Sequence, residues 1–400
     1  MPKLSDKVYT FTDSVIRRMT RIANAHGAIN LSQGFPDFDP PRPILDALSK
    51  IAHTGPHQYA ITYGTPEFRR ALAKKHETFS GCAVDPDHEI VVTCGGTEAM
   101  ITAMMTICNP GDKVIVFSPF YENYGADAIL SGAEPIFVPL TPPDFKYDPV
   151  ALENAFKQGV KAIIVCNPSN PCGKVFTREE LQCIGDLAVK YDAFVITDDV
   201  YEHIVFEPHT HVYAASLPGL KDRVLCCSSL SKTYSITGWR LGYLIGPAEV
   251  IECAKKVHDF LTVGAPHPLQ EAAVVGLNFP KSYYEELLAL YTRKRDRLLR
   301  GLDDLGMIHT VPQGTYFIMV DVSRYLAMEQ FQGWSDNQFC EWMTQYVGVA
   351  PVPGSSFFRE PVNHLIRFHF ARSEATLDDA VKRLSRMDQE AQKVTSHQHR

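Results

Sequence analysis

The residues best suited to chemistry lie at positions 228–240, where a lysine follows an apolar, strand-like run. Lys232 stands among small hydroxyl residues, and Arg240 follows in the same segment. An amine in such surroundings can form a Schiff base with a carbonyl compound, and an arginine and hydroxyl groups can bind a phosphate. Most lysines are solvated surface charges, and Lys232 taken alone would be one of them. Its neighbours favour a reactive amine instead.

Two turns that follow other strand-like runs carry groups that could meet a ligand. The Gly-Gly-Thr-Glu sequence at 95–98 precedes a helical stretch, so the glycines and the free N–H groups of the helix start could hold a phosphate. A plain tight turn before a capped helix is the other interpretation. Residues 166–173 contain two Asn-Pro pairs, which fix turns and display amide side chains. A merely stiff loop would have the same composition.

An acid and an arginine complete this set of groups. Asp198 follows the apolar run 193–197, and a buried acid stays ionised only beside a positive partner such as a protonated ring nitrogen. A helix N-cap is the alternative role. Arg367 lies inside the apolar run 366–370, where an unpaired guanidinium would be costly. It needs an anionic partner, either a substrate carboxylate held by two hydrogen bonds or a buried acid of the protein.

The elements that must position these groups follow from the hydrophobic pattern. Between residues 88 and 250, short apolar runs alternate with amphipathic helical stretches, which indicates an α/β fold with a mostly parallel sheet covered on both faces. Ligands bind at the carboxyl ends of the strands of such sheets, and the turns described above follow strands. After about residue 280 strict alternation stops. A long charged helical stretch at 281–305 and strand-like runs at 314–320 and 365–370 predict a separate α+β unit.

The chain of 400 residues is long enough for two domains. We expect an N-terminal arm over residues 1–45 that joins the small domain, a large domain over 46–285 and a small C-terminal domain over 286–400. A hydrophobic fraction of 45% and a charged fraction of 21% are those of a folded protein and exclude a disordered one.

Charge and cysteine usage narrow the class of protein. The net charge of −7, without a basic block, argues against nucleic acid as the main partner. The ten cysteines show no C-x-x-C spacing, which favours reduced thiols, and no metal site is predicted. Residues 1–22 lack the apolar core of a secretory signal, and no run reaches the roughly 18 apolar residues of a membrane span. We therefore expect a cytoplasmic protein that does not enter a membrane.

Taken together, these stretches resemble the class I and II aminotransferases of PLP (pyridoxal 5'-phosphate) fold type I, closest to the branch of kynurenine, glutamine and methionine aminotransferases. The resemblance implies a large domain with a mostly parallel seven-stranded sheet, which binds PLP, plus a smaller α+β domain. The segments that carry it occur in register over nearly the whole chain, at 30–38, 58–66, 95–97, 167–173, 198–201, 231–233, 237–240 and 366–368.

The resemblance implies a role for each matched catalytic residue. Lys232 resembles the lysine that holds PLP covalently and moves the proton at the substrate Cα. Asp198 resembles the acid that pairs with the pyridinium nitrogen and keeps the ring able to accept electrons. Tyr201 and Asn170 match the pair that hydrogen-bonds the phenolate oxygen of PLP. Tyr121 occupies the position of the aromatic residue that stacks on the ring.

The resemblance also implies a phosphate cup, formed by Gly96, Thr97, Ser229 and Arg240. Several relatives have other residues after the two glycines, so the resemblance implies the backbone contacts of the cup more directly than a contact of the Thr97 hydroxyl. Tyr59 matches a tyrosine that reaches the phosphate from the partner subunit. A complete site would then need a homodimer with a shared active site.

Substrate recognition is expected to involve Arg367, which resembles the arginine that grips the α-carboxylate, assisted by the backbone near Gly34 and by Asn170. Residues 261–270 contain no match to the second, side-chain-binding arginine of aspartate aminotransferases. A neutral, sulfur-containing or aromatic donor is therefore favoured over an acidic one. Four residues could line the side-chain pocket, although packing or surface roles suit them equally well: Ile16, Arg18, Phe35 and Tyr63.

These expectations make the protein a PLP-dependent aminotransferase that moves an amino group from an L-amino acid to a 2-oxo acid by a ping-pong mechanism. Cysteine-conjugate β-elimination and ring-forming PLP synthases use the same constellation and remain alternatives. A non-catalytic, PLP-sensing transcription regulator is disfavoured, because only about thirty residues precede Leu31 and a DNA-binding domain needs more. A nicotinamide enzyme is disfavoured because no G-x-G-x-x-G follows a strand.

Overall fold

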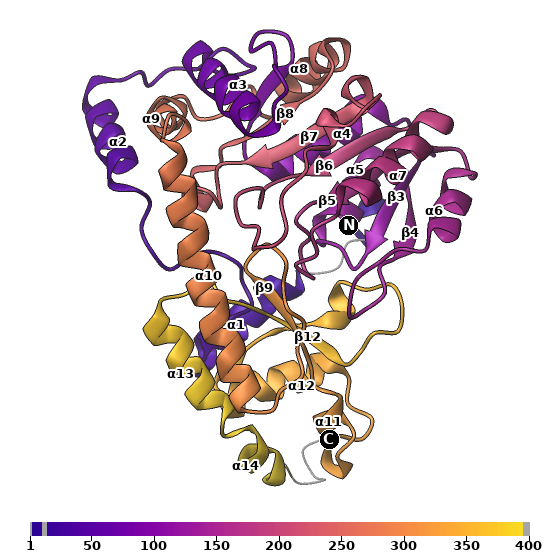
Figure 1. Ribbon diagram of the computed structural model, residues 1–400, viewed down its shortest axis with the longest axis vertical. Coiled ribbons are helices and arrows are strands. Elements are labelled where there is room, and N and C mark those ends of the chain that lie inside the picture. Colours follow the sequence, from indigo (N-terminus) through magenta and orange to yellow (C-terminus); the bar gives the residue numbers. More distant parts are fainter. Residues whose placement is uncertain (1, 10–13, 395–400) are drawn as a thin grey trace.

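The computed structural model describes residues 2–9 and 14–394. Its largest element is a seven-stranded sheet with the order β2-β8-β7-β6-β5-β3-β4, in the upper part of Figure 1. Only β8 runs antiparallel to its neighbours, β2 and β7; the other neighbouring pairs are parallel. The mostly parallel seven-stranded sheet predicted from the sequence is thereby confirmed. The strands are β2 (Ile90–Thr93), β3 (Lys113–Ser118), β4 (Glu134–Pro139), β5 (Val160–Cys166), β6 (Phe194–Asp198), β7 (Val224–Ser229) and β8 (Gly242–Ile245).

Helices cover both faces of this sheet, because successive side chains of its central strands point to opposite faces and both sets are apolar. On β3, Val114 and Val116 join the core that contains α4, α5 and α8, whereas Ile115 and Phe117 join the core that contains α6 and α7. Helices α2, α3 and α9 enclose a further core at the β2 edge. These helices are α2 (Arg42–Thr54), α3 (Pro66–Ser80), α4 (Gly96–Ile107), α5 (Asn123–Ser131), α6 (Pro149–Phe156), α7 (Arg178–Lys190), α8 (Ala248–Thr262) and α9 (His267–Leu277).

The starts of two of these helices show why one of them can meet a ligand. Helix α7 begins with a capping box, in which Thr177 and Glu180 satisfy each other's backbone N–H groups. The N-cap residue of α4 is Gly95, whose φ of 85° lies in the left-handed region. Gly95 has no side chain that could accept a hydrogen bond from the first turn of the helix. The first turn of α4 therefore presents backbone N–H groups at the carboxyl end of β2, as an anion site requires.

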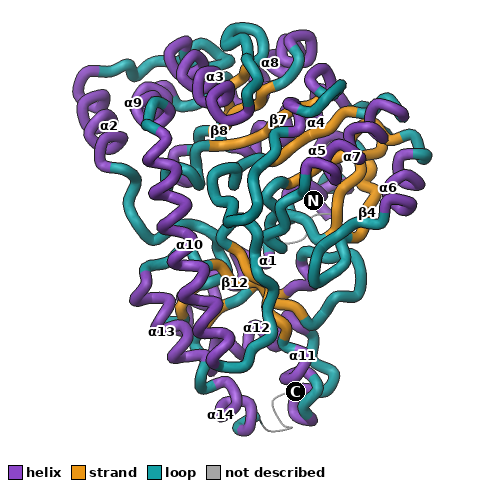
Figure 2. The backbone as a smooth tube through the Cα atoms, in the orientation of Figure 1, coloured by secondary structure: helices purple, strands orange, loops and turns teal. Residues whose placement is uncertain are grey.

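A second group of elements lies below the large sheet in Figures 1 and 2. Three antiparallel strands have the order β11-β12-β9, and β1 pairs in parallel with β10. One continuous apolar core joins these strands to α1, α10 and the C-terminal helices. The elements are α1 (Val15–His26), β1 (Ile29–Asn30), α10 (Lys281–Asp304), β9 (Phe317–Asp321), α11 (Ser323–Leu326), α12 (Asp336–Trp342), β10 (Val349–Ala350), β11 (Val352–Pro353), β12 (Leu365–His369), α13 (Glu374–Leu384) and α14 (Met387–Gln392).

The predicted domain limits at 45/46 and 285/286 stay predictions. The pairing of β1 with β10 agrees with an N-terminal arm that joins the C-terminal elements. Helix α10 runs unbroken across the second limit. Near its start, the hydroxyl of Tyr284 lies 2.8 Å from that of Tyr234, beside the large sheet. Further along, Leu298 and Leu302 belong to the core of the small sheet.

Candidate active site

A cavity of about 800 Å³ lies at the carboxyl ends of β2, β5, β6 and β7, and β9, β12 and the segment after β1 close it from the other side. This is the edge at which parallel sheets bind ligands. Of the residues predicted from the sequence to form the site, the cavity lining contains all but Tyr59: Gly34, Gly96, Thr97, Tyr121, Asn170, Asp198, Tyr201, Ser229, Lys232, Arg240 and Arg367.

The amine of Lys232 is held by the backbone of the N-terminal segment. Its Nζ donates a hydrogen bond to the carbonyl oxygen of Gly34 over 3.0 Å. The hydroxyl of Tyr316 donates to the same oxygen over 2.6 Å, and its ring centroid lies 5.7 Å from Nζ. A Cβ on Gly34 would lie 2.7 Å from the ring of Phe317, so only glycine lets this backbone approach so closely. Sequence reasoning missed Tyr316, because a tyrosine in an apolar strand has no distinguishing spacing.

Asp198 ends β6 and lies half-buried on the cavity floor. It accepts hydrogen bonds from the Tyr124 hydroxyl over 2.6 Å and from the backbone N–H of Val200 over 3.3 Å. Burial raises the pKa of Asp198, while these two bonds and the charge of Lys232 oppose that rise. No cation of the described residues lies within ion-pair distance of its carboxylate. Asp198 therefore has room for a positive partner from a ligand, and a protonated ring nitrogen fits this need.

A more deeply buried acid, Asp127, lies near Asp198. Asp127 of α5 is 3% exposed, and its Oδ2 has no hydrogen-bond partner in the described part of the chain. Burial and the nearby charge of Asp198 raise the pKa of Asp127 to about 8. Asp127 is therefore mostly neutral at pH 7, and Asp198 is the acid of this pair that faces the cavity.

Arg367 of β12 is buried and is held by neutral groups. Its Nη1 donates to Oδ1 of Asn170 over 2.7 Å and its Nη2 to the carbonyl oxygen of Ser32 over 2.8 Å. Its Cζ lies 4.1 Å from the ring centroid of Phe317 and 4.6 Å from that of Phe357. Burial lowers the pKa of Arg367 to about 10. Over residues 2–9 and 14–394, no carboxylate pairs with this guanidinium and its Nε lacks a partner, so an anionic substrate group is the partner that fits.

The residues predicted to form a phosphate cup lie where α4 begins, beside the segment between β7 and β8. Arg240 donates from Nη1 to the carbonyl oxygen of Thr237 over 3.0 Å and from Nη2 to that of Cys94 over 3.3 Å. A Cβ on Gly95 would lie 2.3 Å from Nη2 of Arg240, so glycine is required for this contact. Ser229 also lines the cavity here. An uncapped helix start beside an arginine that binds only carbonyl groups fits a phosphate.

Two tyrosines form aromatic walls of the cavity. Tyr201 is buried and stands edge-on to Tyr316, with ring centroids 5.2 Å apart at 89°. Burial and the neighbouring Tyr316 raise the pKa of Tyr201 well above its ordinary value. Tyr121 lies edge-on to Tyr124 at 5.9 Å, and burial, Glu122 and Asp198 raise its pKa to about 12. Both phenols are therefore neutral hydrogen-bond donors at physiological pH.

The structure separates the residues considered for the side-chain pocket. Ile16 and Phe35 line the cavity. Arg18 instead pairs with Glu341 over 2.5 Å, and Tyr63 lies under the guanidinium of Arg69. Additional lining residues that sequence reasoning missed are Arg17, Gln33, Glu122 and Phe317.

Tyr59 lies outside the cavity and is 84% exposed. Its segment is held against the end of α8 and the start of α9: Thr62 donates to Asp259 over 3.4 Å, and Nδ1 of His267 lies 3.0 Å from the carbonyl oxygen of Gln58. The ring of Tyr59 is therefore presented to the outside rather than to the site of its own chain. Its predicted contact with a second subunit's phosphate stays a prediction.

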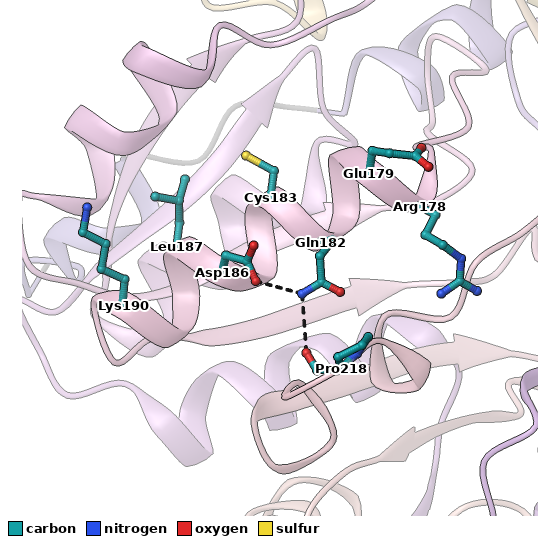
Figure 3. Close-up of a pocket in the computed structure, with 8 residues that line it drawn as sticks. All are labelled: Arg178, Glu179, Gln182, Cys183, Asp186, Leu187, Lys190 and Pro218. Atoms are coloured by element: carbon teal, nitrogen blue, oxygen red, sulfur yellow. Dashed lines mark hydrogen bonds between the residues drawn. The ribbon is translucent and has the colours of Figure 1, made fainter.

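Figure 3 shows a second hollow, of about 620 Å³, along the outer side of α7. Gln182 spans its floor and donates to Oδ1 of Asp186 over 2.8 Å and to the carbonyl oxygen of Pro218 over 3.4 Å. None of the site residues named above lines this hollow. Elsewhere in the described ranges, no three His, Cys, Asp or Glu side chains are arranged to hold a metal, and no helix has the length and hydropathy needed to cross a bilayer.

Comparison with known proteins agrees with this geometry. Residues 26–384 match the family model of aminotransferase class I and II. The methionine aminotransferase of Escherichia coli is 36% identical, over 97% of each chain, and kynurenine–oxoglutarate transaminase 3 of Mus musculus is 35% identical, over 94% of this chain and 89% of the relative. The solved N-succinyldiaminopimelate aminotransferase of Mycobacterium tuberculosis superposes with a TM-score of 0.91 at 34% identity, covering 96% of this chain and 99% of the other. The chain therefore belongs to the class I and II aminotransferases, enzymes that transfer amino groups between amino acids and 2-oxo acids.

Proposed function

We propose that this cavity binds PLP and carries out transamination with Lys232 as the catalytic base. The main observation behind the proposal is that three functional groups line one cavity. The amine of Lys232, the half-buried carboxylate of Asp198 without a cationic partner and the guanidinium of Arg367 without an anionic partner all line it. A cofactor with a ring nitrogen and a substrate with a carboxylate would supply the two missing charges.

PLP, when bound, supplies an electron sink for the pair left on the substrate Cα when its proton is removed. The phosphate cup would bind the phosphate, and Asp198 would keep the ring nitrogen protonated. Arg367 and Asn170 would hold the substrate carboxylate, which would direct the Cα–H toward Lys232. Nζ of Lys232 would then take the proton from the substrate Cα. Most of the rate acceleration then comes from orientation and from charges placed in advance.

The wall of the cavity supports a neutral, sulfur-containing or aromatic amino donor. Ile16, Phe35 and Phe317 contribute apolar surface. Residues 261–270 contain no arginine that could pair with an acidic side chain. Relatives named for methionine and for kynurenine, one sulfur-containing and one aromatic, support the same class of donor.

A homodimer with shared active sites is part of the proposal. Large apolar side chains are exposed on the two adjoining segments that contain Tyr59 and the end of α8, namely Tyr59, Ile61, Phe260, Leu261 and Val263. Phe260 is 91% exposed, and an apolar surface of this kind favours burial against another chain. We also propose a cytoplasmic location, which the ten free thiols support.

The visible absorption spectrum of the purified protein tests the proposed function. A band near that of a lysine-bound PLP should be present, and each good donor in a panel of amino acids should convert it to the pyridoxamine form. Lys232→Ala should fold and dimerise but lose both the band and turnover. A wild-type protein that PLP cannot reconstitute, or a fully active Lys232→Ala variant, would refute the proposal.

A product assay separates transamination from β-elimination. A transaminase needs a 2-oxo acid acceptor to complete its cycle, whereas cysteine-conjugate β-elimination releases pyruvate and ammonia without one. Assays with and without an acceptor, on matched donors, therefore decide between the two activities.

A further inference from the structure

A buried acid–imidazole pair lies directly behind the phosphate cup, and none of the roles assigned above uses it. Glu98 belongs to the first turn of α4 and His258 to α8, and they are 7% and 0% exposed. Nδ1 of His258 lies 2.7 Å from Oε1 of Glu98. Nε2 of His258 lies 2.9 Å from the carbonyl oxygen of Thr62. The hydroxyl of Thr262 donates to Oε1 of Glu98 over 2.7 Å.

The partners of His258 determine where its protons lie. A carbonyl oxygen only accepts, so Nε2 must carry a proton toward Thr62. Nδ1 faces a carboxyl oxygen, so it either donates a second proton or receives one from Glu98. The imidazole, the Thr262 hydroxyl and the Cys94 N–H all lower the pKa of Glu98, against the effect of burial. In either state the net charge of the pair is zero.

The position of Glu98 explains why it needs this neutralisation. Its Oε2 accepts the backbone N–H of Cys94, the residue at which the turn into α4 begins. This bond fixes the turn that presents Gly96 and Thr97 to the cavity. An uncompensated carboxylate in this place would repel a phosphate dianion bound at the same helix start, because the low dielectric of the interior strengthens such repulsion. The proton shared between His258 and Glu98 removes this repulsion, whichever of the two holds it, and leaves the hydrogen bond to Cys94 intact.

We propose that Glu98 and His258 are positioning residues of the phosphate cup: Glu98 shapes the turn that binds the phosphate, and His258 cancels the charge of Glu98 so that a dianion can bind. The inference rests on the proposed function, since it assumes that the cup binds the phosphate of PLP. The same imidazole holds the carbonyl of Thr62, on the segment that presents Tyr59. His258 therefore contacts both the phosphate cup of its own subunit and the segment that presents Tyr59 to a second copy of the chain.

The test compares PLP with pyridoxal, which lacks the phosphate but has the same aldehyde and ring. Dissociation constants of both compounds are measured spectroscopically on apo-protein, for wild type, His258→Gln, Glu98→Gln and the double variant. His258→Gln keeps hydrogen-bonding groups, but its amide cannot take up a proton as an imidazole can. His88→Gln is a matched control, because His88 is exposed in the turn before β2, its Nδ1 lies 3.6 Å from Oε1 of Glu252, and it does not line the cavity.

His258→Gln should weaken PLP at least about tenfold while pyridoxal changes little, because a hydrogen-bonded charge is left unpaired beside the phosphate. Adding Glu98→Gln should restore most of the preference for PLP over pyridoxal, since the uncompensated carboxylate is then gone. The control should match wild type. Equal losses for PLP and pyridoxal, or no recovery in the double variant, would overturn the inference. A wild-type protein that binds neither compound would instead refute the proposed function, so the two failures are distinguishable.

Discussion

Replacing Arg367 by lysine is expected to weaken recognition of the substrate carboxylate without weakening PLP binding. The guanidinium is already held by Asn170 and by the carbonyl of Ser32, and it stacks between Phe317 and Phe357. A lysine retains the charge but has no planar fork, so it cannot donate two parallel hydrogen bonds to a carboxylate.

The magnitude follows from the hydrogen bond that is lost. A hydrogen bond to a charged group contributes about 1.5–3 kcal/mol. Loss of one of the two bonds should therefore lower kcat/KM for the best amino donor by about tenfold to 100-fold. The dissociation constant of 3-phenylpropionate, an unreactive carboxylate, should rise by the same factor, whereas that of its neutral amide should not change.

A matched control guards against a general effect on folding. Arg69 is as buried as Arg367 but pairs with Asp87, outside the cavity. Arg69→Lys should leave the binding of 3-phenylpropionate unchanged. The reasoning fails if Arg367→Lys binds the carboxylate as tightly as wild type, or if it loses the carboxylate and the amide equally.

Three further outcomes are expected. Asp127→Asn should increase the free energy of unfolding of the apo-protein more at pH 8 than at pH 5, as measured by denaturant unfolding. Folding raises the pKa of Asp127 to about 8, so this acid lowers the free energy of unfolding as the pH rises above the pKa that it has in the unfolded chain. An equal gain at both pH values would contradict this. Tyr316→Phe should slow the first half-reaction about tenfold in single-turnover measurements, because the carbonyl that orients Lys232 loses a hydrogen bond; an unchanged rate would count against this role. Gly95→Ala should displace Arg240 and raise the dissociation constant of PLP, and unchanged binding would show that the cup tolerates a Cβ there.

Much of the fold could be predicted because strong local signals and tertiary packing agree. The continuous apolar run of β5 and the capping box at Thr177 identify a buried strand and the helix after it. The helical segment at 336–347 is less regular: α12 ends at Trp342, and Met343–Val347 form a wider π-helical turn. Hydrophobic spacing does not distinguish these two helical types over so short a segment.

Site residues could be predicted from the sequence where a characteristic residue follows the end of a strand. They could not be predicted where the direction of a side chain on a helix, or contact with a second chain, determines whether the residue reaches the site. Ile16 and Arg18 were both considered for the pocket, but residues two apart point about 200° apart on a helix. Ile16 therefore faces the cavity and Arg18 faces Glu341. Glu98 and His258 are far apart in the sequence, and only the packing of α8 on α4 brings them together.

The reversed direction of β8 has a consequence for the order in which the molecule assembles. Strand β2 has β8 as its only neighbour in the sheet, and β8 follows it by about 150 residues. The turn at Gly95 can therefore meet Arg240 only after β8 has entered the sheet between β2 and β7. Such long-range pairing forms late, because the entropy of closing the intervening loop must first be overcome. During synthesis, a nascent chain that ends before residue 245 has no complete phosphate cup. Binding of the cofactor would therefore indicate that the large sheet has formed completely.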